Sequence, residues 1–119
     1  MTSFELVEAI VQILDNKKAE DIRVLRIEDI TILGEYFIIA DSTNMTHVRS
    51  LVDETEFQTK QMGRSPKRIE KDRSSNWVVL DYGDVILHLF YKPTREFYDL
   101  ERLWSDTQEI SVDELLHKE

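Results

Sequence analysis

The sequence contains no cysteine, which excludes disulfide bridges, thiolate zinc sites and cysteine nucleophiles together. Glycine and proline are scarce, with 3 and 2 residues among 119, so we expect long elements and few linkers. No apolar run approaches the roughly 20 residues that a membrane helix needs. The first 14 residues carry two glutamates and no basic cluster, which argues against a secretory signal. We therefore expect a cytoplasmic protein that contacts no membrane.

The chain also has fewer basic than acidic residues, 15 against 24, which gives a formal net charge of −9. Such a protein is repelled by nucleic acid on average. The charge is uneven, however: residues 60–73 hold six basic and two acidic side chains, whereas residues 105–119 hold five acids and one base. The basic segment fits either a contact with RNA beside a basic protein or a solvated loop, and both interpretations remain open.

What the chain does contain is typical of one globular domain, with 41% apolar and 33% charged residues. A capping box between Thr2 and Glu5 opens a predicted helix over residues 3–16. Strands are predicted over residues 21–30 and 34–41, and the second is apolar on both faces, as a central strand would be. A helix follows over residues 42–63, capped by Ser42, Thr43 or Asn44 and stopped at Gly63.

The second half adds a short edge strand near residues 67–70, a hairpin over 76–92 and a helix over 94–104. The helix is expected to begin at Thr94 and to bury one face, formed by Phe97, Leu100, Leu103 and Trp104. A second capping box, Ser111 to Glu114, favours a short helix near the end. The fold class is therefore α/β or α+β: one domain over residues 1–104 with helices packed on a small mixed sheet, followed by an acidic tail over 105–119.

The hairpin corner, "LDYGDVIL", raises the question of a metal site, because Asp81 and Asp84 flank it. Two acids that share a metal on one strand should be two residues apart, and these are three apart. We favour a three-residue loop, Asp81-Tyr82-Gly83, in which Gly83 has positive φ and Asp81 caps the turn. That loop pairs Trp77 with Leu87, whereas a two-residue loop pairs it with His88. The pattern alone leaves the register open, and with it the face on which Trp77 lies.

Other catalytic patterns are weak. His47, His88 and His117 lack ligand spacing, and the chain has no glycine-rich phosphate loop or nucleophile elbow. We predict no catalytic residue, no metal and no cofactor. Two alternatives stay open: a metal-dependent nucleotidyltransferase-like enzyme that uses Asp81 or Asp84, and a homodimeric adaptor.

Four segments carry a resemblance to a known family: "KKAEDIRVLRIED", "EYFIIADSTNMTHVRSLVDE", "WVVLDYGDVILHLF" and "REFYDLERLW". In this order and spacing they resemble the ribosomal silencing factors, also called Iojap-like proteins, from Phe4 to Trp104. The resemblance implies a binding protein that docks on the large ribosomal subunit through its protein uL14. It would block joining of the small subunit sterically and so repress translation when nutrients are limiting.

The resemblance also implies a fold like that of the nucleotidyltransferases, without their catalytic acids. This chain departs from the family at Gly34-Glu35, where a small residue and Asp usually precede the Tyr-Phe pair, and at Ser42 and Asn44, where Gly and Ser are frequent. Both departures weaken any case for residual nucleotide binding. On the ribosome the protein would act as a monomer, and it would be free to form a homodimer when unbound.

Partner-binding residues follow from the matched positions. Trp77 is the first candidate, since Trp, Tyr and Arg commonly dominate interfaces. The remaining candidates are Asp81, Tyr82, His88, Arg95, Tyr98 and Glu101. Each has a structural alternative: a buried neutral histidine, an arginine paired within the fold, or a core tyrosine. Lys67, Arg68 and Lys71 are candidates for incidental contact with ribosomal RNA through phosphates.

Overall fold

A single mixed sheet forms the centre of the computed structural model, which describes residues 1–29 and 31–117, the side chain of Leu103 excepted. The strand order is β3-β4-β5-β2-β1-β6; β2 and β5 are parallel and the other neighbours antiparallel. The strands are β1 (Glu20–Arg26), β2 (Tyr36–Ser42), β3 (Arg68–Lys71), β4 (Trp77–Asp81), β5 (Val85–Tyr91) and β6 (Gln108–Ile110). The helices are α1 (Ser3–Asn16), α2 (Met45–Gln61), α3 (Lys92–Tyr98), α4 (Leu100–Leu103) and α5 (Val112–Leu116). The predicted class, a small mixed sheet packed with helices, is confirmed.

The first helix and the central strand form as their local sequence predicts. The Thr2 hydroxyl accepts from the Glu5 amide at 3.1 Å, and the Glu5 carboxylate accepts from the Thr2 amide at 2.7 Å, so the capping box is present. β2 lies between β5 and β1 and is buried on both faces from Phe37 to Ser42. Asn44 caps α2, and Gly63, with φ of +88°, follows its last turn.

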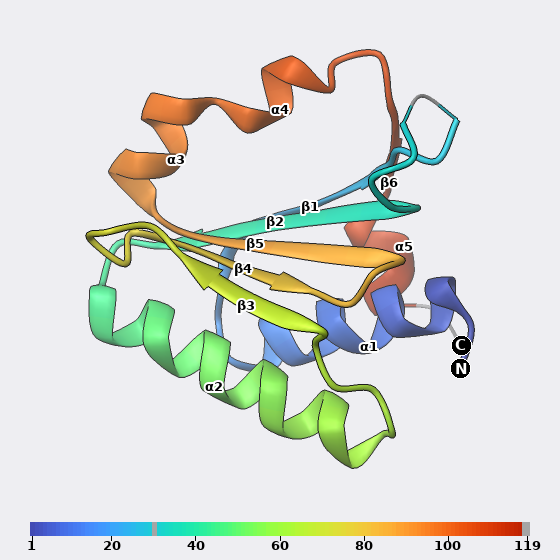
Figure 1. Cartoon of the computed structure of the whole chain (residues 1–119), viewed down its shortest axis with the longest axis horizontal. Coiled ribbons are helices and arrows are strands. Elements are labelled where there is room, and N and C mark those ends of the chain that lie inside the picture. The colour runs from blue at the N-terminus through green and yellow to red at the C-terminus, as the bar shows by residue number, and fades with distance from the viewer. Residues whose placement is uncertain (30, 118–119) are drawn as a thin grey trace.

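The two faces of the sheet carry unequal cores (Figure 1). α1 and α2 cover one face and bury Leu6, Ile10, Leu14 and Leu51 against inward side chains of the strands, such as Leu87. α3 and α4 cross the opposite face, where a smaller core gathers. Its members are Leu25, Ile27, Phe37, Ile39, Phe90 and Leu100, with Trp77, Ile86 and Trp104 partly buried against them. The thin second layer leaves part of this face open to solvent.

The predicted helix over residues 94–104 is wrong in two respects. The observed helix begins at Lys92, with Tyr91 rather than Thr94 as its N-cap. It breaks at Asp99, whose φ of 46° and ψ of 54° are left-handed. The break changes the buried face: Leu100 is buried as expected, but Phe97 is 82% exposed. Trp104 is half-buried, and the side chain of Leu103 lies outside the described residues. A single helical stripe cannot continue through a left-handed residue, so the expected core position of Phe97 is lost.

The hairpin register differs from both predicted ones. The loop has two residues, Gly83 and Asp84, closed by a hydrogen bond from the Tyr82 amide to the Val85 carbonyl at 2.9 Å. Trp77 consequently pairs with Phe90. Gly83 occupies the first loop position with φ of +92°, so no tyrosine has to adopt a positive φ. Asp81 does cap the turn, because its carboxylate accepts from the Gly83 amide at 2.8 Å.

Residues 108–116 extend the fold beyond the α3–α4 layer. β6 adds an antiparallel strand beside β1, and α5 packs against α1 with Val112, Leu115 and Leu116 on the larger core. Ser111 caps α5 by accepting from the Glu114 amide. In the part of the chain that the structure describes, no helix is long and apolar enough to cross a membrane.

Candidate partner-binding surface

Trp77 lies on the open face of the sheet, at the start of β4, and is half-buried. Its indole stacks on Phe90 at 5.0 Å between ring centroids and contacts Tyr98 of α3 at 4.9 Å. Its other neighbours, Glu70 and Val79, line a shallow hollow on the β3 side of the ring. The indole is thus held by its neighbours while one side stays accessible, as a binding residue requires.

His88 fixes the orientation of that indole. Its Nδ1 accepts from Trp77 Nε1 at 3.1 Å, while the imidazole packs edge-on against Phe37 at 4.7 Å. Burial lowers the pKa of His88 to about 4, so the ring is neutral at physiological pH. A neutral ring that accepts at Nδ1 carries its proton on Nε2, which is buried and has no hydrogen-bond partner among residues 1–29 and 31–117. His88 therefore positions Trp77 and is itself covered.

Two further aromatic side chains extend the surface along α3. Tyr98 is 46% exposed and lies between Trp77 and Phe97, whose ring meets it edge-on at 5.2 Å. Phe97, Tyr98 and Trp77 form a continuous row, which we call the aromatic row. The helical spacing predicted a core position for Phe97, and the sequence signal for its exposure is Asp99, a turn-forming residue two positions later.

Arg95 is buried in a charge cluster beneath α3. Its guanidinium donates to the Asp41 carboxylate at 2.9 Å, to the Asp21 carbonyl at 2.7 Å and to the Glu101 carboxylate at 3.2 Å. Burial raises the pKa of Asp41, although the hydrogen bond from Arg95 opposes that rise. Glu101 also lies 3.7 Å from Arg23 on β1. Arg95 and Glu101 therefore join α3 and α4 to the sheet and shape the surface that α3 presents.

Two hairpin candidates lie away from the aromatic row. Tyr82 is buried on the α2 side of the sheet, where its hydroxyl hydrogen-bonds Thr59 at 2.9 Å, and burial raises its pKa to about 12. Asp81 is half-buried at the hairpin corner and accepts from Arg68 at 3.1 Å. The structure thus brings Trp77, His88 and Tyr98 together and places Tyr82 on the opposite face.

The second corner acid, Asp84, is also used within the fold. Its carboxylate accepts from Arg64 at 2.5 Å and from the Ser3 hydroxyl at 2.7 Å. Burial alone would raise the pKa of Asp84, but the hydrogen bonds from Arg64 and Ser3 lower it below its usual value. Among the described residues, no three His, Asp or Glu side chains are placed to hold a metal ion.

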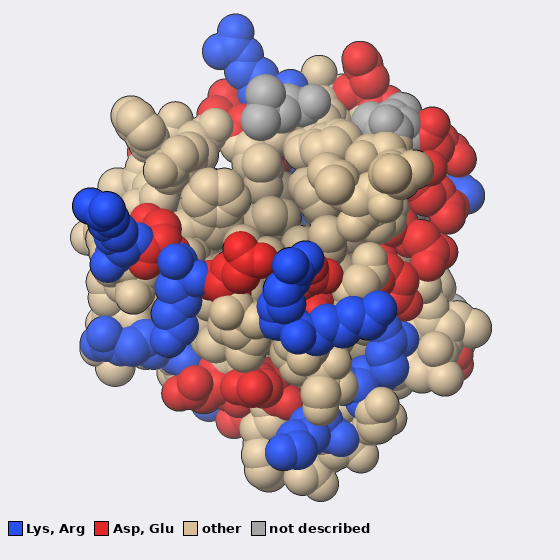
Figure 2. All heavy atoms as spheres, viewed as in Figure 1, with Lys and Arg blue, Asp and Glu red and all other residues tan. Residues whose placement is uncertain are grey.

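The basic candidates form a separate surface along the edge strand β3. Figure 2 shows blue side chains across the front of the molecule, over β3, interleaved with red ones, below a largely uncharged region. Lys67, Arg68 and Lys71 are all exposed. Arg68 lies 3.6 Å from Glu70 and 3.1 Å from Asp81, so its charge is partly compensated.

Comparison with known proteins identifies the family. The family described as "Ribosomal silencing factor during starvation" matches residues 1–119. Ribosomal silencing factor RsfS of Halalkalibacterium halodurans is 31% identical over 113 residues, 95% of this chain and 97% of the relative. The crystal structure of protein CV0518 from Chromobacterium violaceum superposes with a TM-score of 0.84 at 29% identity, covering 93% of this chain and 92% of that one.

A more distant relative is the mouse protein named "Mitochondrial assembly of ribosomal large subunit protein 1", which is 29% identical over 83% of this chain and 45% of its own length. With a family match over its whole length, an RsfS relative of similar size and a solved structure that shares its fold, the chain belongs to the ribosomal silencing factor (RsfS, Iojap-like) family.

Proposed function

We propose that this protein docks on the large ribosomal subunit through the protein uL14 and blocks joining of the small subunit. The observation that carries the proposal is that the aromatic row remains accessible on one face of the sheet. Phe97 and Tyr98 are exposed, and Trp77 is half-buried beside them. Exposed aromatic side chains of this size are characteristic of interface centres. Family membership indicates the ribosome as the target, and the name of the mouse relative points to the large subunit.

The mechanism needs no chemical step. A domain bound at the subunit interface occupies volume that the small subunit must occupy, so the two compete. Repression then follows mass action: the fraction of large subunits blocked depends on the protein concentration relative to its dissociation constant. Expression under nutrient limitation would raise that fraction, and ribosomes in the cytoplasm would be the site of action.

Trp77→Glu tests the docking surface. Truncating or charging a central aromatic residue typically costs 2 kcal/mol or more of binding free energy, about 30-fold in affinity. Purified protein is sedimented with separated large and small subunits, and wild type should pellet with the large subunit only. Phe57→Glu is the matched control, because Phe57 is 59% exposed but lies on α2, on the other face of the sheet.

Since Trp77 also packs on Phe90, its variant must be shown to be folded by thermal denaturation. Phe97→Glu gives a second variant whose wild-type side chain is 82% exposed, so its folding should be unaffected. If wild type binds neither subunit, the proposal is wrong. If it binds the large subunit but does not lower the yield of joined ribosomes in a light-scattering assay, docking stands and steric blocking fails.

Lys67, Arg68 and Lys71 are proposed to touch ribosomal RNA at the edge of the footprint. Replacing all three by Gln should reduce affinity for the large subunit and flatten its dependence on salt concentration, because fewer counterions are released. If the dependence of affinity on salt concentration does not change, these three side chains do not contact RNA. The proposed monomer on the ribosome and dimer in free solution are tested by light scattering at several concentrations.

A further inference from the structure

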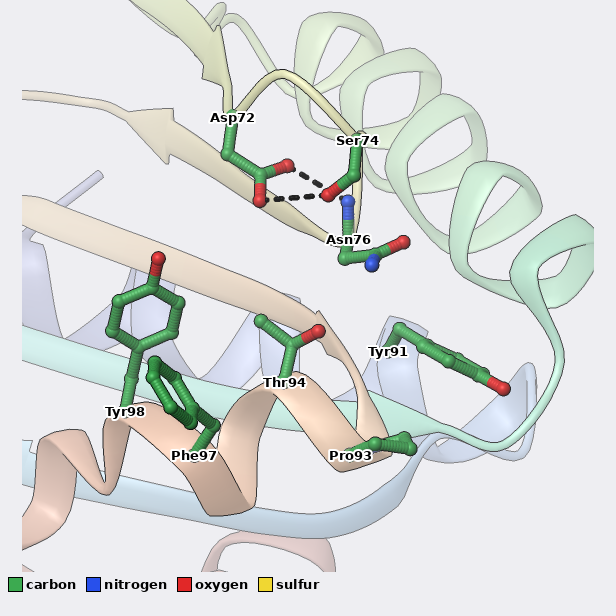
Figure 3. Close-up of a pocket in the computed structure, with 8 residues that line it drawn as sticks. All are labelled: Asp72, Ser74, Asn76, Tyr91, Pro93, Thr94, Phe97 and Tyr98. Carbon is green, nitrogen blue, oxygen red and sulfur yellow. Dashed lines mark hydrogen bonds between the residues drawn. The ribbon is translucent and has the colours of Figure 1, made fainter.

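A hollow of about 310 Å³ opens beside the aromatic row, between α3 and the loop that joins β3 to β4 (Figure 3). On one side lie the rings of Phe97 and Tyr98, and across the space Asp72, Ser74 and Asn76 project from the loop. The lining residues are Asp72, Ser74, Asn76, Tyr91, Pro93, Thr94, Phe97 and Tyr98. Apart from these aromatic rings, the walls are largely polar.

Asp72 gives the hollow a fixed negative charge. It is the one carboxylate among the lining residues, and none of them carries a basic side chain. One carboxylate oxygen accepts from the amides of Asn76 at 2.8 Å and Trp77 at 3.3 Å, and the other accepts from the Ser74 hydroxyl at 3.0 Å. No described Lys or Arg forms a salt bridge with this carboxylate. Its second oxygen keeps capacity for another donor, because a carboxylate accepts about four hydrogen bonds.

The aromatic wall suits a cation as well. Phe97 and Tyr98 are 82% and 46% exposed, and their planes are inclined by 84°, so ring faces of both orientations border the opening. A guanidinium over such a face gains cation–π attraction, and arginine stacks better than lysine because its group is planar and weakly hydrated. The negative charge of Asp72 disfavours a phosphate or carboxylate in the same place.

We propose that this hollow binds the side chain of an arginine from the protein partner, with its guanidinium between the Phe97–Tyr98 rings and the Asp72 carboxylate. The identity of the partner as a large-subunit protein rests on the proposed function above; recognition of the arginine side chain does not. Asp72 and Phe97 would thus extend the contact surface beyond Trp77 and select a basic protein surface.

The first test is independent of the ribosome. The full chain, labelled with ¹⁵N, is titrated with N-acetyl-arginine amide, and with the lysine and citrulline analogues as probes of charge and planarity. The arginine probe should shift the amide resonances of Ser74, Asn76, Thr94 and Tyr98 with a dissociation constant in the millimolar range. The lysine probe should bind several-fold more weakly. Citrulline, which has the same shape without the charge, should shift none of them.

Two variants test the carboxylate and the aromatic ring of the hollow separately. Asp72→Asn keeps an oxygen to accept from the Asn76 and Trp77 amides, so the loop should retain its shape while its charge is lost. Phe97→Leu keeps an exposed apolar side chain but removes the ring. Each should weaken arginine binding at least fivefold, and the control Asp53→Asn on the surface of α2 should not change it. Equal shifts with arginine and citrulline, or unchanged binding in both variants, would overturn the proposal.

The same variants then enter the co-sedimentation assay. If wild type binds the large subunit and Asp72→Asn lowers its affinity about tenfold, the hollow is part of the interface. If the variants lose arginine binding but bind the large subunit as wild type does, the arginine does not come from that partner and this inference fails while the proposed function stands. If wild type does not bind the large subunit, the proposed function fails, and the titration alone decides whether the hollow recognises arginine.

Discussion

Replacing Arg95 by methionine tests whether the buried charge cluster holds α3 against the sheet. The side chain of Arg95 is 5% exposed and that of Asp41 is 2% exposed, so the substitution leaves a carboxylate in the core without its cation. Breaking a buried pair on one side costs about 3–5 kcal/mol of unfolding free energy. For a chain of this length, that corresponds to a fall in melting temperature of about 10–20 °C.

The pH dependence of this loss follows from Asp41. Burial raises the pKa of Asp41 in the folded state even with Arg95 present, and removing Arg95 should raise it further. A carboxyl whose folded pKa lies above its unfolded value favours folding when protonated and disfavours it once pH rises through the folded pKa. The unfolding free energy of Arg95→Met should therefore lie furthest below that of wild type at neutral pH, and the difference should decrease as pH falls toward 4.

Urea denaturation of both proteins from pH 4 to 7.5 measures this difference. Arg68→Met serves as the control, because Arg68 is 67% exposed and pairs on the surface, so its removal should leave the transition close to that of wild type. If Arg95→Met is no less stable than Arg68→Met, or if its deficit grows on acidification, the assignment of Arg95 to a structural charge cluster is refuted.

Three further predictions concern other contacts, and urea denaturation tests each of them. Burial lowers the pKa of His88 to about 4, below its value in the unfolded chain. The unfolding free energy of wild type should therefore fall by about 3 kcal/mol between pH 6.5 and pH 4, and that of His88→Gln should lack this fall. Parallel pH profiles of the two proteins would contradict the prediction. Tyr82→Phe should cost about 1 kcal/mol because it removes the hydrogen bond between the Tyr82 and Thr59 hydroxyls, while Thr59 keeps its bond to the Thr55 carbonyl. In the Tyr82→Phe background, Thr59→Val should cost less than it does alone; strict additivity would exclude the bond between the hydroxyls. Gly63→Ala should cost about 1 kcal/mol because the φ of Gly63 is +88° and nothing lies within 4 Å of the added Cβ. Gly83→Ala should cost at least as much, because the φ of Gly83 is +92° and its Cβ would meet the Lys67 side chain. A Gly63→Ala stability equal to that of wild type would exclude the positive φ.

The parts of the fold that local chemistry decides were predictable. The Thr2–Glu5 capping box, the apolar run of β2 and the glycine after α2 each depend on residues close in sequence. β6 was missed because Gln108–Ile110 is a strand of three residues, and its pairing with β1 joins segments that lie far apart in the sequence. Nothing in three residues signals a partner strand that lies more than 80 positions earlier in the chain.

The register of the hairpin shows why the candidate site was harder to predict than the fold. Side chains alternate along strands, so a loop of three residues in place of two exchanges the faces of one arm. The favoured three-residue loop would have set Trp77 beside Leu87, which faces α1 and α2. The observed pairing with Phe90 places it under α3. One position in the turn therefore decides which core Trp77 joins and whether it can meet Tyr98 at all.

Burial changes what the resemblance implies about individual residues. His88 and Arg95 are buried, and each positions a more accessible neighbour: His88 holds the Trp77 indole, and Arg95 holds the helix that carries Tyr98. The left-handed Asp99 completes the arrangement, because it lets Leu100 turn inward while Phe97 stays in solvent. Substitutions at such positions should lower ribosome binding only as far as they disturb the aromatic row, so their effects on affinity and on stability should scale together, whereas those at Phe97 should change affinity alone.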